Sequence, residues 1–202
     1  MMNMNVADNH VAVGGDFSRI FEPKDFLTMI NIPDAALCVL RAHLILEEFL
    51  NLWSGKVTGT EDLYAGGFVA FKTKLIISKN LGLSEELFII MDRVNEIRNR
   101  FSHRKGHVLE ASMLEALKKK VDLAVPAAPV LKCEEFSLWA GWTDQHGKPA
   151  QITHEWKGAD TRIRFLIVFV AFMLKFTHWI QCAFNARGIS YEIVAVPAQN
   201  SK

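Results

Sequence analysis

The sequence predicts an all-α fold, an up-and-down bundle of four to five long helices with a small insertion before the last helix. Apolar residues recur at helical spacing along most of the chain. Glycine, proline or a polar capping residue lies where most of these stretches begin or end. Half of the 202 residues are hydrophobic and 22% are charged, so the chain can bury one core. We therefore expect a single helical domain made of residues 23–124 and 159–188.

Charge and cysteine content argue against several classes of protein. The formal net charge is +1, which disfavours a broad basic surface for non-specific duplex binding. The three cysteines, Cys38, Cys133 and Cys182, are far apart and lack C-x-x-C spacing, so neither a disulfide framework nor a zinc site is indicated. The N-terminus lacks the pattern of a secretory signal. We expect a cytoplasmic protein with reduced thiols, and we predict no metal and no cofactor.

The first part of the chain is expected to hold an arm, a short helix and a long helix. Residues 1–22 show little periodicity, and we interpret them as a loose N-terminal arm. A short helix is predicted from Pro23, because proline is favoured in a first helical turn. Asp34 then opens the first long helix, which is expected to end near Trp53, just before Gly55.

This first long helix carries one wide apolar face and two narrow polar rows. The apolar residues expected to be buried are Leu37, Leu40, Leu44, Ile45, Phe49 and Leu52. One polar row holds Asp34, Arg41 and Glu48 at heptad spacing, and the other holds His43, Glu47 and Asn51 at i, i+4 and i+8. The pattern is typical of a helix within a bundle.

Three further helices are predicted before residue 124. Helical spacing resumes over residues 68–80, after a glycine-rich connection. Ser84 is a good N-cap for a helix over residues 85–103, and two glutamates follow it in the first turn, where negative charge suits the helix dipole. A last helix in this part covers residues 109–121 and ends in a run of three lysines. The bundle is thus expected to continue up to the insertion.

Residues 125–158 differ from the rest of the chain, because proline, glycine and tryptophan alternate there with polar residues. We interpret them as an insertion. Two alternating segments, 136–139 and 151–156, flank a polar turn and are compatible with a β-hairpin. The tryptophans of this insertion are Trp139, Trp142 and Trp156. We expect them to form a small satellite core rather than a platform on which a ligand or single-stranded nucleic acid stacks.

The last long helix is predicted to extend to about Ala186 and to be followed by a C-terminal tail over residues 189–202. Residues 165–174 are all apolar, but Lys175 follows them directly. A membrane-spanning helix needs about 20 predominantly apolar residues, and a charge at its centre costs at least ~2.5 kcal/mol. We therefore favour a helix buried in the bundle, or between the bundle and a second subunit, over a transmembrane helix.

The predicted helix over residues 85–103 carries the most reactive set of side chains in the sequence. Asn95, Asn99 and His103 recur at i, i+4 and i+8, and Arg98 and Ser102 lie beside this row. The opposite side of the helix is apolar. The usual templates, such as phosphate-binding glycine loops, nucleophile elbows and zinc-protease spacing, are absent from the sequence. We therefore expect any chemistry to use this polar row.

Arginine and histidine at this spacing are sufficient for RNA cleavage without a metal ion. The permanent charge of Arg98 can neutralise a phosphate, and His103 can move a proton at the 2′-hydroxyl or the leaving oxygen. Five residues advance a helix by about 500°, so the two side chains point about 140° apart. They can address one phosphate only if the helix ends near His103 or if another helix or subunit completes the site. The alternative is an ordinary solvated face, on which Glu96 and Arg100 form a surface pair.

The segment from Arg98 to His103 matches the R-x(4–6)-H pattern of the HEPN superfamily, with asparagine after the arginine and a small residue before the histidine. The surrounding chain resembles the mannitol operon repressor branch of that superfamily. The segments that carry this resemblance are, in order, 34–37, 47–50, 71–75, the motif helix and the Arg164-Phe165 start of the last helix. Together the resemblance covers residues 27–104 and 160–186.

The resemblance implies a helical bundle that dimerises so that two motifs face a common cleft. It implies a metal-independent endoribonuclease of toxin or phage-defence character, with RNA as substrate and an antitoxin or regulatory protein as partner. The implied catalytic residues are Arg98, Asn99 and His103, with an acidic residue, Glu47 or Glu48, on the first long helix. Control by adenylylation is not implied, because Lys105 replaces the tyrosine that such toxins carry. The alternative is a non-enzymatic regulator without its own DNA-binding motif, as in the mannitol repressors; no membrane is implied.

Overall fold

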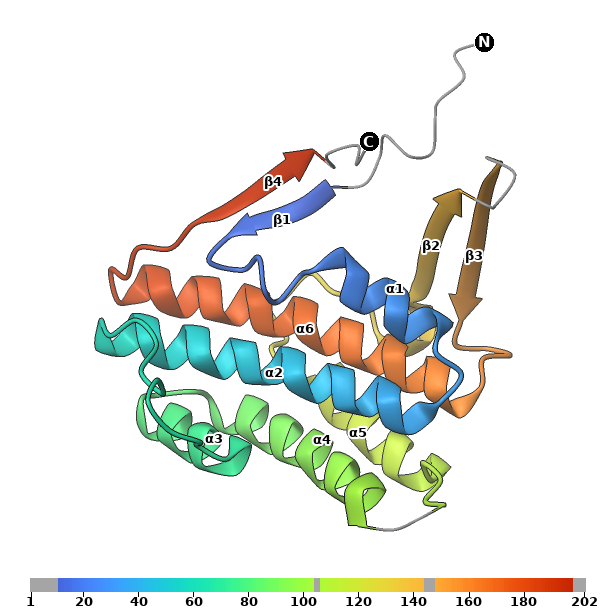
Figure 1. Ribbon diagram of the computed structural model, residues 1–202, viewed down its shortest axis with the longest axis horizontal. Coiled ribbons are helices and arrows are strands. Elements are labelled where there is room, and N and C mark those ends of the chain that lie inside the picture. The colour runs from blue at the N-terminus through green and yellow to red at the C-terminus, as the bar shows by residue number, and fades with distance from the viewer. Residues whose placement is uncertain (1–10, 104–105, 144–147, 198–202) are drawn as a thin grey trace.

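The structure is a computed structural model, and it describes residues 11–103, 106–143 and 148–197. The protein is mostly helical, with a two-stranded hairpin before the last helix, as the sequence predicts (Figure 1). The helices are α1 (Pro23–Asn31), α2 (Ala35–Thr58), α3 (Phe71–Asn80), α4 (Glu85–His103), α5 (Ala111–Leu123) and α6 (Thr161–Ala186). The strands are β1 (Val11–Gly15), β2 (Ser137–Thr143), β3 (Pro149–Glu155) and β4 (Ile193–Pro197), and a 3-10 turn covers Cys133–Glu135.

The two long helices α2 and α6 begin at aspartate caps. The Asp34 carboxylate accepts from the N–H groups of Ala36 and Leu37, and the Asp160 carboxylate accepts from Ile163 N–H at 2.7 Å. Helix α2 continues five residues past the expected end at Trp53 and stops at Gly59, where φ is 67°. Ser54 does not end the helix because its buried hydroxyl donates to the carbonyl of Leu50, one turn earlier.

Helix α6 lies beside α2 along the length of the bundle (Figure 1) and supplies much of the core. Aromatic side chains join the two helices: Phe49 and Phe176 stack at 4.4 Å between ring centroids, and Trp53 and Phe184 at 5.6 Å. By length and composition α6 is apolar enough to cross a membrane, and 72% of its most apolar window is buried within the protein. Other parts of the same chain therefore cover most of this apolar helix. This favours the first of the two predicted alternatives, burial in the bundle, over burial against a second subunit.

Lys175 interrupts the apolar run of α6 and is itself buried, with 4% of its surface exposed. Its ammonium donates to the carbonyl oxygens of Val121, Asp122 and Ala124 at 2.9, 3.0 and 2.8 Å. These carbonyls lie at the C-terminal end of α5, where the last carbonyls of a helix lack their usual intrahelical donors; Val121 also accepts a longer bond from Ala124 N–H at 3.3 Å. Lys175 therefore caps α5 from a neighbouring helix and joins the two helices.

The N-terminal segment differs from the loose arm expected for residues 1–22. Residues 11–15 form β1, which pairs antiparallel with β4 from the opposite end of the chain. Gly15 has φ 73°, and a Cβ there would lie 2.5 Å from the carbonyl oxygen of Glu192, so the ribbon requires glycine at this position. Phe17 and Ile20 follow and are buried in the core. This part of the arm is thus integrated into the bundle, and residues 1–10 lie outside the described residues.

The hairpin β2–β3 projects from the helices (Figure 1). Trp156, just after β3, is 9% exposed and lies beneath the cations of Lys118 and Arg164, 5.6 and 5.3 Å from its ring. Trp156 belongs to the main hydrophobic core of the protein rather than to a separate satellite core. Trp139 is 47% exposed, and the side chain of Trp142 lies outside the described residues.

Candidate functional site

The predicted motif lies at the C-terminal end of α4, whose apolar side chains bury one face of the helix. Those buried residues are Leu87, Ile90, Met91, Val94 and Ile97. The hydroxyl of Ser84 has no hydrogen-bond partner among the described residues, so its expected capping bond is not formed there. Helix α4 is described as far as His103, and the chain lies in a turn at Gly106. The helix therefore ends near His103, which is the first of the two conditions under which Arg98 and His103 can address one phosphate.

The motif side chains gather on the last two turns of α4. Arg98 and Asn99 are half-buried, and the Arg98 guanidinium donates to Asn99 Oδ1 at 3.1 Å. The Nε of Arg98 is buried without a partner among the described residues. Ser102 is exposed, but its hydroxyl donates to the backbone carbonyl of Arg98 at 3.2 Å. His103, the last described residue of the helix, is exposed. Asn99 thus orients the guanidinium, while His103 is accessible to a ligand; Lys105 lies outside the described residues.

The surface pair expected between Glu96 and Arg100 does not form. Glu96 instead pairs with Arg93 at 2.6 Å, and Arg100 lies 3.8 Å from Glu110, which precedes α5. Both partners lie outside the motif. These exposed pairs contribute little to stability, and they leave the guanidinium of Arg98 unpaired with any carboxylate among the described residues.

Asn95 differs from its predicted place on a solvent-facing row. It is 9% exposed, and its Oδ1 lies 3.1 Å from Nε2 of His43, a buried residue of α2. The ring of His43 also packs on Phe71, with 4.1 Å between ring centroids. Asn95 therefore lies in the interface between α2, α3 and α4, because His43 of α2 provides a polar partner for it there. The sequence alone did not identify His43 as the partner of Asn95. The polar row of His43, Glu47 and Asn51 on α2 was the feature that could have indicated it.

Burial lowers the pKa of His43 below its ordinary value of 6.5. The nearby charge of Arg98 acts in the same direction, while the hydrogen bond to the Asn95 oxygen and the charge of Glu47 oppose it only in part. His43 is therefore neutral at neutral pH. The same interactions show that His43, Glu47, Asn95 and Arg98 lie close together.

This lowered pKa predicts a pH-dependent stability. Between pH 6.5 and the lower pKa of folded His43, the unfolded chain binds a proton that the folded chain does not. The free energy of unfolding should therefore fall as the pH drops through this window, and His43 contributes nothing to the slope above it. Urea unfolding from pH 4.5 to 7.5 should give a steeper profile for the wild type than for His43→Gln. Equal slopes would contradict the assignment.

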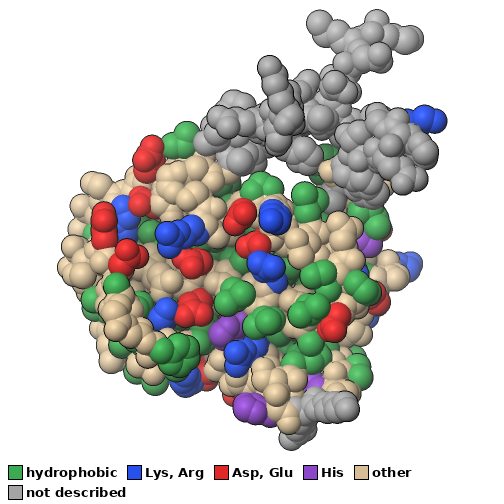
Figure 2. Space-filling view, viewed as in Figure 1, with side chains coloured by type: hydrophobic (Ala, Val, Ile, Leu, Met, Phe, Trp, Pro, Cys, Tyr) green, Lys and Arg blue, Asp and Glu red, His purple; other side chains and the backbone are tan. Residues whose placement is uncertain are grey.

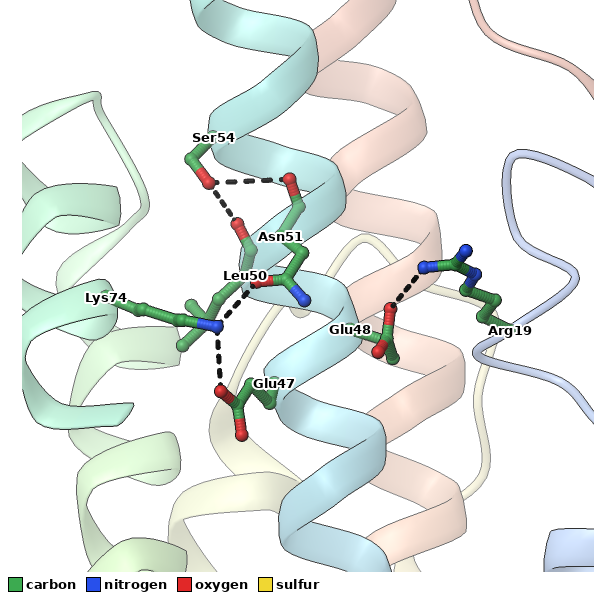
Figure 3. Close-up of polar contacts among 7 residues, drawn as sticks. All are labelled: Arg19, Glu47, Glu48, Leu50, Asn51, Ser54 and Lys74. Carbon is green, nitrogen blue, oxygen red and sulfur yellow. Dashed lines mark hydrogen bonds and ion pairs between the residues drawn. The ribbon is translucent and has the colours of Figure 1, made fainter. Parts of the chain in front are cut away.

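The two acidic candidates on α2 point in different directions (Figure 3). Glu47 pairs with Lys74 of α3 at 2.8 Å, on the side of the motif helix, and the same ammonium donates to Asn51 at 3.1 Å. Glu48 points toward the N-terminal segment, where Arg19 lies 4.0 Å away. Glu47 thus faces α3 and Glu48 faces the N-terminal segment, and among the described residues no ion pair joins either carboxylate to Arg98 or His103.

Three apolar residues of α2 are exposed, although the sequence suggests burial. Leu37, Leu40 and Leu44 are 50%, 38% and 46% exposed. They recur at i, i+3 and i+7, and Leu40 lies about 60° around the helix from His43. We call these three residues the leucine stripe. The core takes the other faces of α2, which are also apolar: Cys38, Val39, Ala42, Ile45 and Leu46. Hydrophobic side chains interspersed with histidine and basic groups are visible on this face of the molecule (Figure 2).

The side chains that could bind a metal ion or supply a reactive thiol are considered next, for the described part of the chain. It contains no group of three histidine, cysteine or acidic side chains that could hold a metal ion. Cys38 and Cys133 are buried, and burial raises the pKa of the Cys38 thiol to about 12. Cys182 is exposed, and its sulfur lies 3.7 Å from Nε2 of His178.

Comparison with known proteins adds no family assignment. No protein-family model, no curated protein and no solved structure matches this chain.

Proposed function

We propose that the protein is a metal-independent endoribonuclease of HEPN type that acts in the cytoplasm with toxin or phage-defence character. The observation that carries this proposal is the C-terminal part of α4, where a half-buried Arg98 is oriented by Asn99 and His103 is exposed. No carboxylate of the described residues neutralises Arg98, so its charge is available to a phosphate.

The chemistry divides between these side chains. A ribose 2′-oxygen attacks the adjacent phosphorus, and the 5′-oxygen of the next nucleotide leaves. One group must accept the proton of the 2′-hydroxyl and another must supply a proton to the leaving oxygen. Arg98 stabilises the charge that builds on the phosphorus, with Asn99 fixing its orientation. Asn95, bonded to His43, supports the helix from the interface with α2, and Ser102 supports the backbone of the last turn.

One accessible histidine per motif supplies only one of the two proton-transfer groups, which favours a homodimer. A second copy would bring a second His103 to a shared cleft. Most of the apolar window of α6, 72% of it, is already buried within the protein, so α6 offers less apolar surface for such a contact. The leucine stripe is exposed on α2, the helix that packs against α4 through His43 and Asn95. We place the dimer contact there, because Leu37, Leu40 and Leu44 have the spacing of a helix-helix seam.

Incubation of the purified protein with a structured RNA in excess EDTA tests this function. The wild type should cut the RNA, and His103→Ala should lower the rate at least about 100-fold, the usual contribution of general acid-base catalysis. Asp92→Ala, a change elsewhere on α4, should retain the wild-type rate. Intact RNA with the wild type, or equal cleavage by wild type and His103→Ala, would contradict the proposal.

The exposed leucine stripe also favours a second candidate function, a non-enzymatic regulator or interaction module in the manner of the mannitol operon repressors. In this case α2 and α4 bind a regulatory protein or an antitoxin. Stoichiometric co-purification of one protein, lost in Arg98→Glu and retained in His103→Gln, would support this function over RNA cleavage.

A further inference from the structure

A cavity of about 750 Å³ lies apart from the motif, over the C-terminal half of α2. Its walls are the segment between β1 and α1, the loop over residues 59–65 and the start of the chain segment that leads to β4 (Figure 1). None of Arg98, Asn99 and His103 lines it. Its volume is in the range of small-molecule sites, which are about 300–1,000 Å³.

The floor of the cavity carries hydrogen-bond donors. Lys74 is 8% exposed, and its ammonium bonds Glu47 and Asn51 while lying 4.9 Å over the ring of Tyr64. Asn51 accepts through its Oδ1, and its amide nitrogen points away from Lys74 toward the side that carries Glu48 (Figure 3). The hydroxyl of Tyr64 is buried without a partner among the described residues. A polar ligand would satisfy these groups.

The rim of the cavity carries charges of both signs. The Arg19 side chain is 78% exposed and has only a 4.0 Å contact with Glu48. Glu61 and Asp62 line the loop side, are exposed, and make no ion pair with the described residues. The Asp62 backbone has φ 50°, an uncommon conformation for a residue other than glycine. Carboxylates thus lie on one wall of the cavity and a guanidinium on another.

The charges that line the cavity indicate which class of ligand it could bind. Four carboxylates and three cations line the cavity, and one cation, Lys56, is already paired with Asp16 at 2.7 Å. A polyanion such as a nucleotide would meet an excess of negative charge. A molecule with one anionic and one cationic end matches both the donors and the carboxylates.

We propose that this cavity binds a small zwitterion, a free amino acid or a dipeptide. Its carboxylate contacts Arg19 and the amide of Asn51, and its ammonium contacts Asp62 and Glu61. Arginine suits a carboxylate because its planar donors match the two oxygens. The site does not depend on RNA cleavage, since it shares no residue with the motif.

Thermal-shift screening with the twenty proteinogenic amino acids and a set of dipeptides, followed by calorimetry on the best probe, tests this site. The zwitterion should raise the melting temperature, because a ligand that binds only the folded state stabilises it. The same probe with its amine acetylated, or with its carboxylate converted to an amide, should bind about tenfold more weakly, as expected for one lost charge-assisted contact.

Two variants on opposite walls locate the binding. Arg19→Gln and Asp62→Asn should each weaken the best probe about tenfold, and both side chains are exposed, so the fold should be unaffected. Arg93→Gln, a matched change on α4 outside the cavity, should retain wild-type affinity. The proposal is overturned if no probe shifts the melting temperature, if the acetylated anion binds as well as the zwitterion, or if both cavity variants retain full affinity.

Discussion

Leu40→Glu is expected to leave the protein monomeric and to abolish RNA cleavage. Leu40 is the middle residue of the leucine stripe and is 38% exposed in the single chain. Burying an unpaired carboxylate in an apolar contact costs about 3 kcal/mol or more, which weakens association by more than roughly 100-fold. Light scattering should therefore show a dimer for the wild type and a monomer for the variant. Cleavage in EDTA should be lost together with the dimer, because His103 of the second subunit is then missing.

Ile76→Glu is the matched control for this change. Ile76 is a comparably exposed apolar residue, at 45%, but it lies on α3 outside the leucine stripe. This variant should keep the dimer and the cleavage rate. If Leu40→Glu remains dimeric, or if it becomes monomeric and still cuts RNA at the wild-type rate, the shared site is wrong. Far-UV circular dichroism checks that both variants are folded.

Lys175→Met is expected to lower the free energy of unfolding by about 1–3 kcal/mol. Methionine has nearly the length of lysine, so packing is largely kept and only the donor is removed. The carbonyls of Val121, Asp122 and Ala124 then lose the ammonium that bonds all three. Each lost bond costs about 1 kcal/mol, and the ammonium's own desolvation, which lowers the pKa of Lys175, offsets part of this.

Chemical denaturation followed by tryptophan fluorescence measures the effect of Lys175→Met. Lys119→Met, an exposed lysine on α5, is the control and should change stability by less than about 0.5 kcal/mol. Equal stability of Lys175→Met and the wild type would show that the buried ammonium contributes nothing as a cap.

The helices and the hairpin could be predicted because they depend on local pattern. Asp34 and Asp160 mark helix starts by their capping chemistry, and the alternating segments around the insertion turn mark β2 and β3. The pairing of β1 with β4 could not be predicted this way. These strands are five residues each and lie at opposite ends of the chain, so nothing in their neighbourhood indicates the partner.

The faces of α2 and α4 could be predicted only in part. Helix α2 is apolar on several sides, so periodicity cannot decide which leucines face the core; Leu37 and Leu44 remain outside it. The spacing of the sequence groups Asn95 with the polar row of α4, but the structure buries it against His43, a residue 52 positions earlier. Helical geometry does predict that Arg98 and His103 point about 140° apart, and both lie within the last two described turns of α4.

Cleavage of a single RNA in EDTA, compared with the same oligonucleotide carrying 2′-deoxyribose at the cut position, tests the central claim most directly. We predict that the wild type cuts the RNA and produces a 2′,3′-cyclic phosphate, whereas the deoxy-substituted strand stays intact. His103→Ala should cut neither strand. Loss of cleavage in EDTA, or equal cleavage of the two strands by the wild type, would contradict it.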